Sequence, residues 1–115
     1  MNEIIIKGID FGSIDLDRFI PENPRNFCLW LTLSIGLKDS DGSHLFQVGV
    51  CTVAWLSHKI SAEHIFSLRN MILVEEFDFQ LIKKKLFEIV ADSQRSSWDE
   101  SVQALSRHFS WEFEN

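Results

Sequence analysis

Apolar and polar positions alternate most regularly between residues 27 and 37, which predicts a long strand. One face of this strand carries Phe27, Leu29, Leu31, Leu33, Ile35 and Leu37. The other face carries small or polar residues, interrupted by Trp30. Successive side chains of a strand point to opposite faces, so the pattern indicates an antiparallel sheet that is covered on one side only.

Three further segments have the pattern of strands. Residues 3–9 form a short first strand, residues 45–55 return after a turn at residues 38–43, and residues 71–77 form another strand. In the returning strand, Gly49 indicates a bulge or a close approach by another group. Residues 10–26 contain Gly12, Pro21 and Pro24, which predicts an ordered loop with at most one helical turn. A loop of this length in a small domain is often functional.

Helical periodicity and capping residues appear in the second half of the chain. A short helix is predicted to open at Ser61, which can cap it, while Ile60 and Ile65 form a hydrophobic staple. A longer helix is predicted over residues 79–92, with Asp78 as its cap. Its buried stripe consists of Phe79, Ile82, Leu86, Ile89 and Val90, and the three lysines at 83–85 fall on its exposed side.

The last segment combines a helix with a strand. Ser97 and Glu100 have the spacing of a capping box, which starts a helix. One apolar stripe of that helix consists of Trp98, Val102, Leu105 and Phe109. Residues 111–114 then alternate with period two, as a half-buried strand does. Glu112 and Glu114 share one face of this strand, which we interpret as its solvated face. The alternative interpretation is that these two acids form an acidic patch for a partner.

These elements predict one α+β domain. Their order is strand, loop, strand, strand, short helix, strand, helix, helix, strand. This order favours a mostly antiparallel sheet with the two main helices packed on one face. With 115 residues, the chain has the length of one domain, spanning residues 1–115.

The charge of the chain narrows the choice of partner. Its formal net charge is −6 at pH 7. Surfaces that bind nucleic acid are basic, so the negative net charge argues against binding to nucleic acid. It is compatible with a basic protein partner. The sequence has no apolar run long enough to cross a membrane and no secretory signal pattern. We therefore expect a cytoplasmic protein that does not act at a membrane.

Cys28 and Cys51 are the only cysteines, and both lie inside predicted strands. In the cytoplasm they are expected to be reduced thiols that serve in packing. A disulfide between them is possible only if the two strands pair side by side at these positions.

Motifs for metal binding or catalysis are missing from the sequence. His58 and His64 are six residues apart, unlike the i, i+4 pair of a zinc-binding helix. There is no G-x-S-x-G sequence and no glycine-rich phosphate loop. We therefore expect no metal, no cofactor and no catalytic residue. The one catalytic alternative is an acid pair among Glu75, Glu76 and Asp78.

Trp30 stands out because it lies on the polar face of its strand. An exposed tryptophan there would be a candidate binding hot spot, since aromatic residues are enriched at such positions. Alternatively, Trp30 packs under the loop of residues 10–26. We favour this packed arrangement.

Five short motifs, in order along the chain, carry a resemblance to a known family. They are Ile14-Asp15-Leu16-Asp17, the segment from Pro21 to Phe27, Val48-Gly49-Val50-Cys51-Thr52 with Trp55-Leu56, Ser97-Trp98-Asp99-Glu100, and Trp111-Glu112-Phe113-Glu114. With these motifs the chain resembles immunity-protein family 8 of bacterial polymorphic toxin and contact-dependent growth inhibition systems. The family usually has proline after the Cys-Thr pair, where this chain has Val53.

The resemblance implies an antitoxin that binds and neutralises a cognate toxin domain and has no catalysis of its own. Many such toxins are nucleases, whose sites are basic, so an acidic inhibitor can place carboxylates where phosphates bind. We expect a monomer that binds one toxin at or near its active site. The candidate contact residues are Asp10, Asp15, Asp17, Glu22, Asp39 and Asp41, with Trp30 as a further candidate. The alternative function is an acidic adaptor domain unconnected with toxins.

Overall fold

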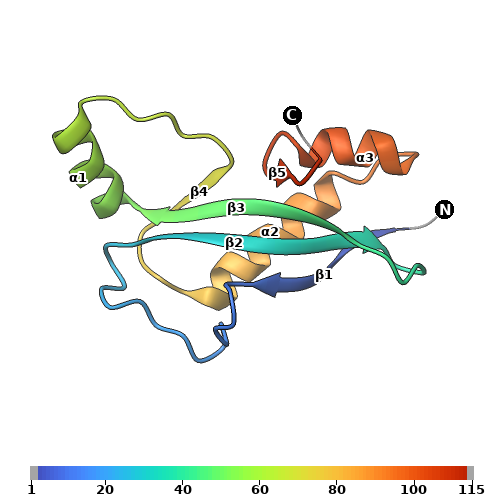
Figure 1. The fold of residues 1–115 in the computed structure, drawn as a ribbon, viewed down its shortest axis with the longest axis horizontal. Coiled ribbons are helices and arrows are strands. Elements are labelled where there is room, and N and C mark those ends of the chain that lie inside the picture. The colour runs from blue at the N-terminus through green and yellow to red at the C-terminus, as the bar shows by residue number, and fades with distance from the viewer. Residues whose placement is uncertain (1–2, 114–115) are drawn as a thin grey trace.

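The computed structural model describes residues 3–113, which form one mixed sheet and three helices (Figure 1). The strands are β1 (Ile4–Asp10), β2 (Cys28–Leu37), β3 (His44–Thr52), β4 (Met71–Val74) and β5 (Ser110–Trp111). The helices are α1 (Val53–Glu63), α2 (Phe79–Asp92) and α3 (Trp98–Leu105).

The sheet is mostly antiparallel, in the order β1-β2-β3-β4. β1 and β3 both run antiparallel to β2, whereas β4 runs parallel to β3. β5 pairs antiparallel with β3 along the same edge as β4, since β4 pairs with residues 49–52 and β5 with residues 46–47. The predicted α+β class and mostly antiparallel sheet are therefore confirmed.

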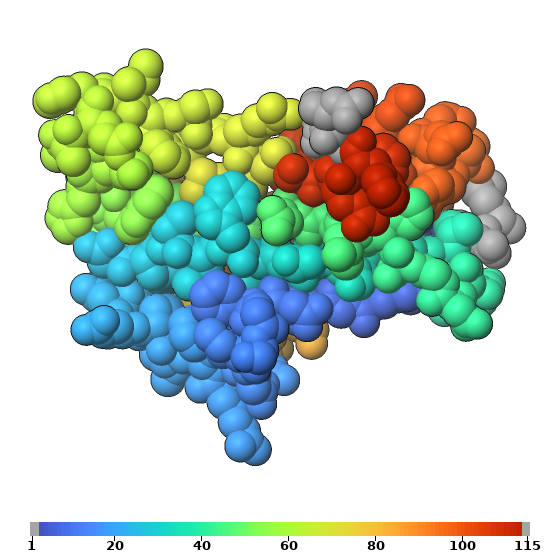
Figure 2. Space-filling model, viewed as in Figure 1, coloured from blue at the N-terminus to red at the C-terminus, as the bar shows by residue number. Residues whose placement is uncertain are grey.

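Both main helices cover one face of the sheet, which we call the inner face. Phe46 on β3 is fully buried against Phe109, and Leu86 of α2 and Leu105 of α3 belong to the same core. The predicted inner-face residues Leu29, Leu31, Leu33 and Ile35 are all buried. Figure 1 shows α2 running behind β2 and β3. The opposite, outer face of the sheet looks toward the viewer in Figures 1 and 2.

The first helix begins much earlier than the sequence pattern predicted. β3 ends at Thr52 rather than at residue 55, and α1 starts at Val53. Thr52 caps α1, because its hydroxyl oxygen accepts a hydrogen bond from Trp55 N at 3.2 Å. Ser61 lies inside the helix, and Ile65 is 80% exposed, so the predicted cap and staple were wrong. The apolar run after Thr52 fits either a strand or a helix, and only the cap distinguishes them.

The other predicted caps are confirmed. Asp78 accepts a hydrogen bond from Leu81 N at the start of α2, and Ser97 accepts one from Glu100 N at the start of α3. The Glu100 carboxylate accepts a hydrogen bond from the Ser97 hydroxyl, whereas in the usual capping box it accepts one from the backbone N–H of the cap residue. The strand predicted over residues 71–77 ends earlier, at Val74.

The C-terminal segment is less regular than predicted. α3 ends at Leu105, and Phe109 reaches the core from the turns that follow the helix. The last strand consists of Ser110 and Trp111, and Phe113 is 61% exposed, so within the described residues the strand predicted over residues 111–114 is present at Trp111 and does not continue through Phe113. Glu114, the predicted partner of Glu112 on one face, lies outside the described residues.

The long loop after β1 is ordered by its own core, as predicted. One helical turn forms where Phe19 N donates to Asp15 O at 3.0 Å, and Leu16 in this turn is buried. Edge-to-face aromatic contacts then link Phe11, Phe19, Phe77 and Phe27 at centroid distances of 5.5–5.7 Å. This aromatic chain fastens the loop to β2 and to the segment before α2.

Replacing Thr52 with Ala is expected to lower the free energy of unfolding by about 2–3 kcal/mol. Thr52 Oγ1 is buried and accepts hydrogen bonds from both Phe27 N and Trp55 N. Its loss therefore removes the helix cap and leaves the buried Phe27 N–H without an acceptor. Thr52→Ser keeps the oxygen and should lose about 1 kcal/mol at most. Urea denaturation measures both variants, and equal stability of the two would show that the hydroxyl contributes nothing.

Candidate partner-binding surface

Trp30 lies at the centre of an apolar cluster on the outer face. Strand register places Trp30 opposite Gly49, and Gly49 opposite Met71 of β4. A Cβ atom on Gly49 would lie 3.0 Å from the indole and 3.1 Å from Met71 Cγ, so a side chain here would displace these neighbours and glycine leaves room for their close approach. Leu73, two residues along β4, is half exposed on the same face. The predicted close approach at Gly49 is thus confirmed.

The indole of Trp30 is 47% exposed, so the prediction that it packs under the loop of residues 10–26 was wrong. Its contacts at Gly49 and Met71 lie on the side of β3 and β4. The physical reason is that Gly49 leaves a flat place on β3, where the large ring rests without another covering element. In Figure 2, β2 and β3 (cyan to green) lie uncovered across the middle of this face.

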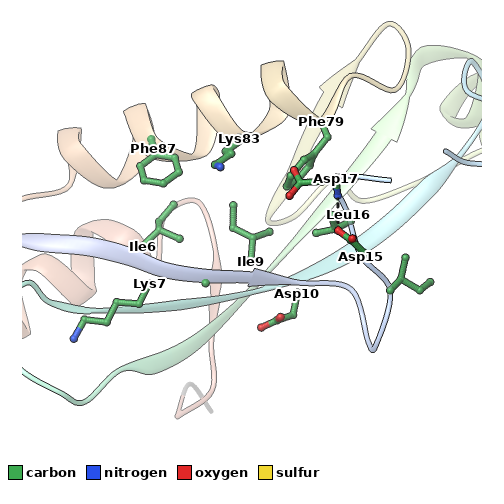
Figure 3. A pocket seen from close by; sticks show the side chains of 12 residues that line it. Ile6, Lys7, Ile9, Asp10, Asp15, Leu16, Asp17, Phe79, Lys83 and Phe87 are labelled. Carbon is green, nitrogen blue, oxygen red and sulfur yellow. Dashed lines mark hydrogen bonds between the residues drawn. The ribbon is translucent and has the colours of Figure 1, made fainter. Parts of the chain in front are cut away.

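Asp10 reaches the same face from β1. It pairs with Thr32, whose neighbours Leu31 and Leu33 are buried on the inner side, so Asp10 and Thr32 point outward. Figure 3 shows Asp10 on the side of β1 opposite to Ile9, whose side chain points toward α2. Diagonal neighbours on adjacent strands are about 7–8 Å apart. The fold therefore brings Asp10 and Trp30 together, although they are 20 positions apart in the sequence.

The turn that carries Asp39 and Asp41 folds onto the far end of the outer face. Lys7 Nζ donates to the carbonyl oxygens of Ser40 and Gly42, the latter at 2.9 Å. The Gly42 carbonyl lies directly over Gly36, where a side chain would collide with it. Both aspartates are exposed and, within residues 3–113, neither forms an ion pair.

A separate groove of about 400 Å³ runs between β1 and α2 (Figure 3). Its apolar walls include Ile6, Ile9, Phe79 and Phe87, and Lys83 points into it from α2. Lys83 is only half exposed, which corrects the prediction of three lysines on a solvated side.

Asp15 and Asp17 lie at one end of this groove, away from Trp30. The Asp15 carboxylate accepts from Asp17 N at 3.1 Å and faces Arg18 Nε at 3.7 Å, so it serves the local turn. Glu22 is exposed further along the same loop. Three of the predicted carboxylates, Asp10, Asp15 and Asp17, therefore line the groove together. Asp10 also lies one diagonal position from Trp30 in the strand register.

The acids of the catalytic alternative have structural contacts. Glu75 and Glu76 lie 3.7 and 3.8 Å from the Arg25 guanidinium, and both are well exposed. Asp78 caps α2. Across the described part of the chain, no group of three or more His, Cys, Asp or Glu side chains could hold a metal ion.

Met71 and Leu73 are surface residues that sequence reasoning missed. Alternation along residues 71–74 could have indicated them, because Ile72 and Val74 pack against the core while Leu73 points outward. Their place beside Trp30, however, depends on the parallel pairing of β4 with β3. A parallel pairing requires the crossover through α1, whose start was mispredicted.

Cys28 and Cys51 are direct cross-strand neighbours, which meets the geometric condition for a disulfide, and the structure has them as free thiols. Burial, together with the smaller effect of the nearby Cys28, raises the pKa of the Cys51 thiol to about 11. Burial also raises the pKa of Cys28, partly offset by the Lys59 ammonium. Both thiols are therefore poor nucleophiles at neutral pH.

These raised pKa values predict a loss of stability at alkaline pH. The unfolded thiol of Cys51 ionises near its ordinary value of 9.0, whereas the folded thiol stays neutral to about 11. Its contribution to stability is present below pH 9 and falls as the pH rises to about 11, by about 1.4 kcal/mol per pH unit at most. Urea denaturation between pH 8 and 11 should show a shallower loss for Cys51→Ala than for the unsubstituted protein. Parallel curves would contradict the assignment.

Nearly the whole chain matches one known protein family. Residues 4–115 match the family described as Immunity protein 8. No curated protein and no solved structure matches the chain. Among the described residues, none of the helices has the length and apolar character needed to cross a membrane. Because the match spans essentially the whole chain, the protein belongs to the Immunity protein 8 family.

Proposed function

We propose that this protein is an antitoxin that binds the toxin domain of its own polymorphic toxin or contact-dependent growth inhibition system. It acts in the cytoplasm as a monomer that binds one toxin, without catalysis. Membership of the Immunity protein 8 family supports the inhibitory role. The toxin is a nuclease, and the antitoxin occupies its active site or an adjacent surface.

The observation that carries this proposal is an uncovered sheet face with an exposed tryptophan, bordered by carboxylates without partners. Asp10, Asp39 and Asp41 form no ion pair among residues 3–113. By contrast, Lys59 pairs with Glu63 and Lys85 with Glu88 on the helices. Unpaired exposed carboxylates attract a basic partner through long-range electrostatic steering.

The proposed contact surface combines the loop after β1 with the turn between β2 and β3. The loop contributes Asp10, Asp15, Asp17 and Glu22, and the turn contributes Asp39 and Asp41. A nuclease holds phosphates with basic residues, so carboxylates at these places can occupy its cleft. Loops reach into a cleft more readily than a flat sheet does.

Co-expression with the toxin domain encoded immediately upstream tests the proposal directly. We expect the protein to restore growth of cells that produce the toxin, and purified components to bind one to one in a calorimetric titration. Binding should weaken as the salt concentration rises, because exposed charges are screened. Absence of both binding and protection would overturn the antitoxin function and leave the adaptor alternative.

Neutralising the triple set Asp10→Asn, Asp39→Asn and Asp41→Asn is expected to slow association with the toxin about tenfold at low salt. The control is Glu88→Gln, Asp92→Asn and Asp99→Asn, which changes the net charge equally at exposed positions on and beside the helices. Stopped-flow association rates compare the two. Equal slowing would attribute the effect to net charge and contradict the proposed surface.

A further inference from the structure

Trp30 and Asp10 together have the chemistry of a cation-binding site on the outer face. We propose that they bind one arginine of the toxin, with its guanidinium stacked on the exposed indole and paired with the Asp10 carboxylate. This inference rests on the proposed antitoxin function and specifies the chemistry of its contact.

The support beneath Trp30 holds the ring ready for stacking. The indole lies over Gly49, with 3.0–3.1 Å from its atoms to the position of a Cβ on that residue, and Met71 Cγ lies 3.1 Å from the same position. The ring is nevertheless 47% exposed, so a partner can reach it. Little conformational freedom is lost when a group stacks on a ring that is already held in place.

Asp10 is the carboxylate closest to the ring in the strand register. It lies one diagonal position from Trp30, about 7–8 Å between strands, which a guanidinium can span while it stacks. Asp10 Oδ2 lies 3.9 Å from the place of a Cβ on Gly8, which pairs with Ser34, so the carboxylate leans away from Trp30 in this structure. Asp10 is exposed, and rotation of its side chain brings the carboxylate toward the ring when a guanidinium binds. No ion pair occupies Asp10 in the described part of the chain.

Among residues 3–113, no cation of the chain fills this site. The outward residues of β2 and β3 that surround it are Thr32, Ser34 and Gln47, all uncharged. The nearest lysine on β1 is Lys7, whose ammonium is held by the Ser40 and Gly42 carbonyls. The site therefore combines an aromatic face and a carboxylate that both lack a cationic partner.

An arginine fits this pair better than an apolar side chain or a lysine does. An apolar group could cover Trp30, Met71 and Leu73, but it would bury Asp10 without a partner, which is costly. The planar guanidinium can stack on an indole and donate two parallel hydrogen bonds to a carboxylate. A lysine ammonium cannot do both in one geometry.

The test measures the affinity of the purified toxin domain for variants of this protein. Trp30→Ala is expected to weaken binding at least tenfold, and Trp30→Phe less, because phenylalanine is a weaker partner for a cation. Asp10→Asn should weaken binding and reduce its salt dependence. Leu81→Ala, at an exposed apolar position on α2, is the control and should leave the affinity within twofold.

Single arginine-to-alanine and arginine-to-lysine variants of the toxin identify the partner residue. One toxin arginine should show non-additive effects with both Trp30→Ala and Asp10→Asn, and its lysine variant should lose most of the coupling. Gly49→Ala supplies a second probe that displaces the ring without removing it, and it should weaken binding as well. Circular dichroism melting confirms that each variant is folded.

Two results would overturn the inference. If Trp30→Ala and Gly49→Ala fold and bind within twofold of the unsubstituted protein, the ring is not a contact. If Trp30 matters but no toxin arginine couples to it, the occupant is apolar and the cation assignment is wrong. Failure of the unsubstituted protein to bind the toxin is a different outcome, which removes the proposed function itself.

Discussion

Burial of one face of β2 and β3 against α2 and α3 is the constraint on which the rest of the structure depends. Phe46, Leu86, Leu105 and Phe109 are all fully buried in this layer. Since a sheet in this arrangement needs cover on one side only, both helices can pack on that side. The outer face is thereby left open for a ring as large as that of Trp30. The same one-sidedness supports the stability of the domain and provides a surface for a partner.

The arrangement of charge follows from this division. Several acids on helices and their connections are engaged locally: Glu63 with Lys59, Glu75 with Arg25, and Asp78 as a helix cap. Asp10 and the two aspartates of the β2–β3 turn have no such partners among the described residues. Exposed ion pairs contribute little to stability, so leaving these acids unpaired costs the fold little. In the function that we propose, their free charge steers a basic toxin into contact.

The hairpin of β2 and β3 and the two main helices could be predicted because their signals are local. Alternation along residues 27–37 and the caps at Asp78 and Ser97 lie within a few positions of the elements that they define. The start of α1 could not be predicted in this way. Thr52 must bond both Trp55 N, which is nearby, and Phe27 N, which is 25 positions away. The prediction that Trp30 is covered by the loop was wrong for a similar reason, because the position of its ring depends on Gly49 across the strand pair.

The sequence by itself determined the class of the fold, the identity of the inner face, the free state expected of the cysteines and the acidic character of the chain. These properties follow from composition and from periodicities of two and 3.6 residues. Only the tertiary structure decided which predicted residues share a surface. It placed Asp10 one diagonal position from Trp30, brought Asp10, Asp15 and Asp17 to the groove along α2, and added Met71 through the parallel pairing of β4. Strand order and register bring distant residues together, and no local periodicity records them.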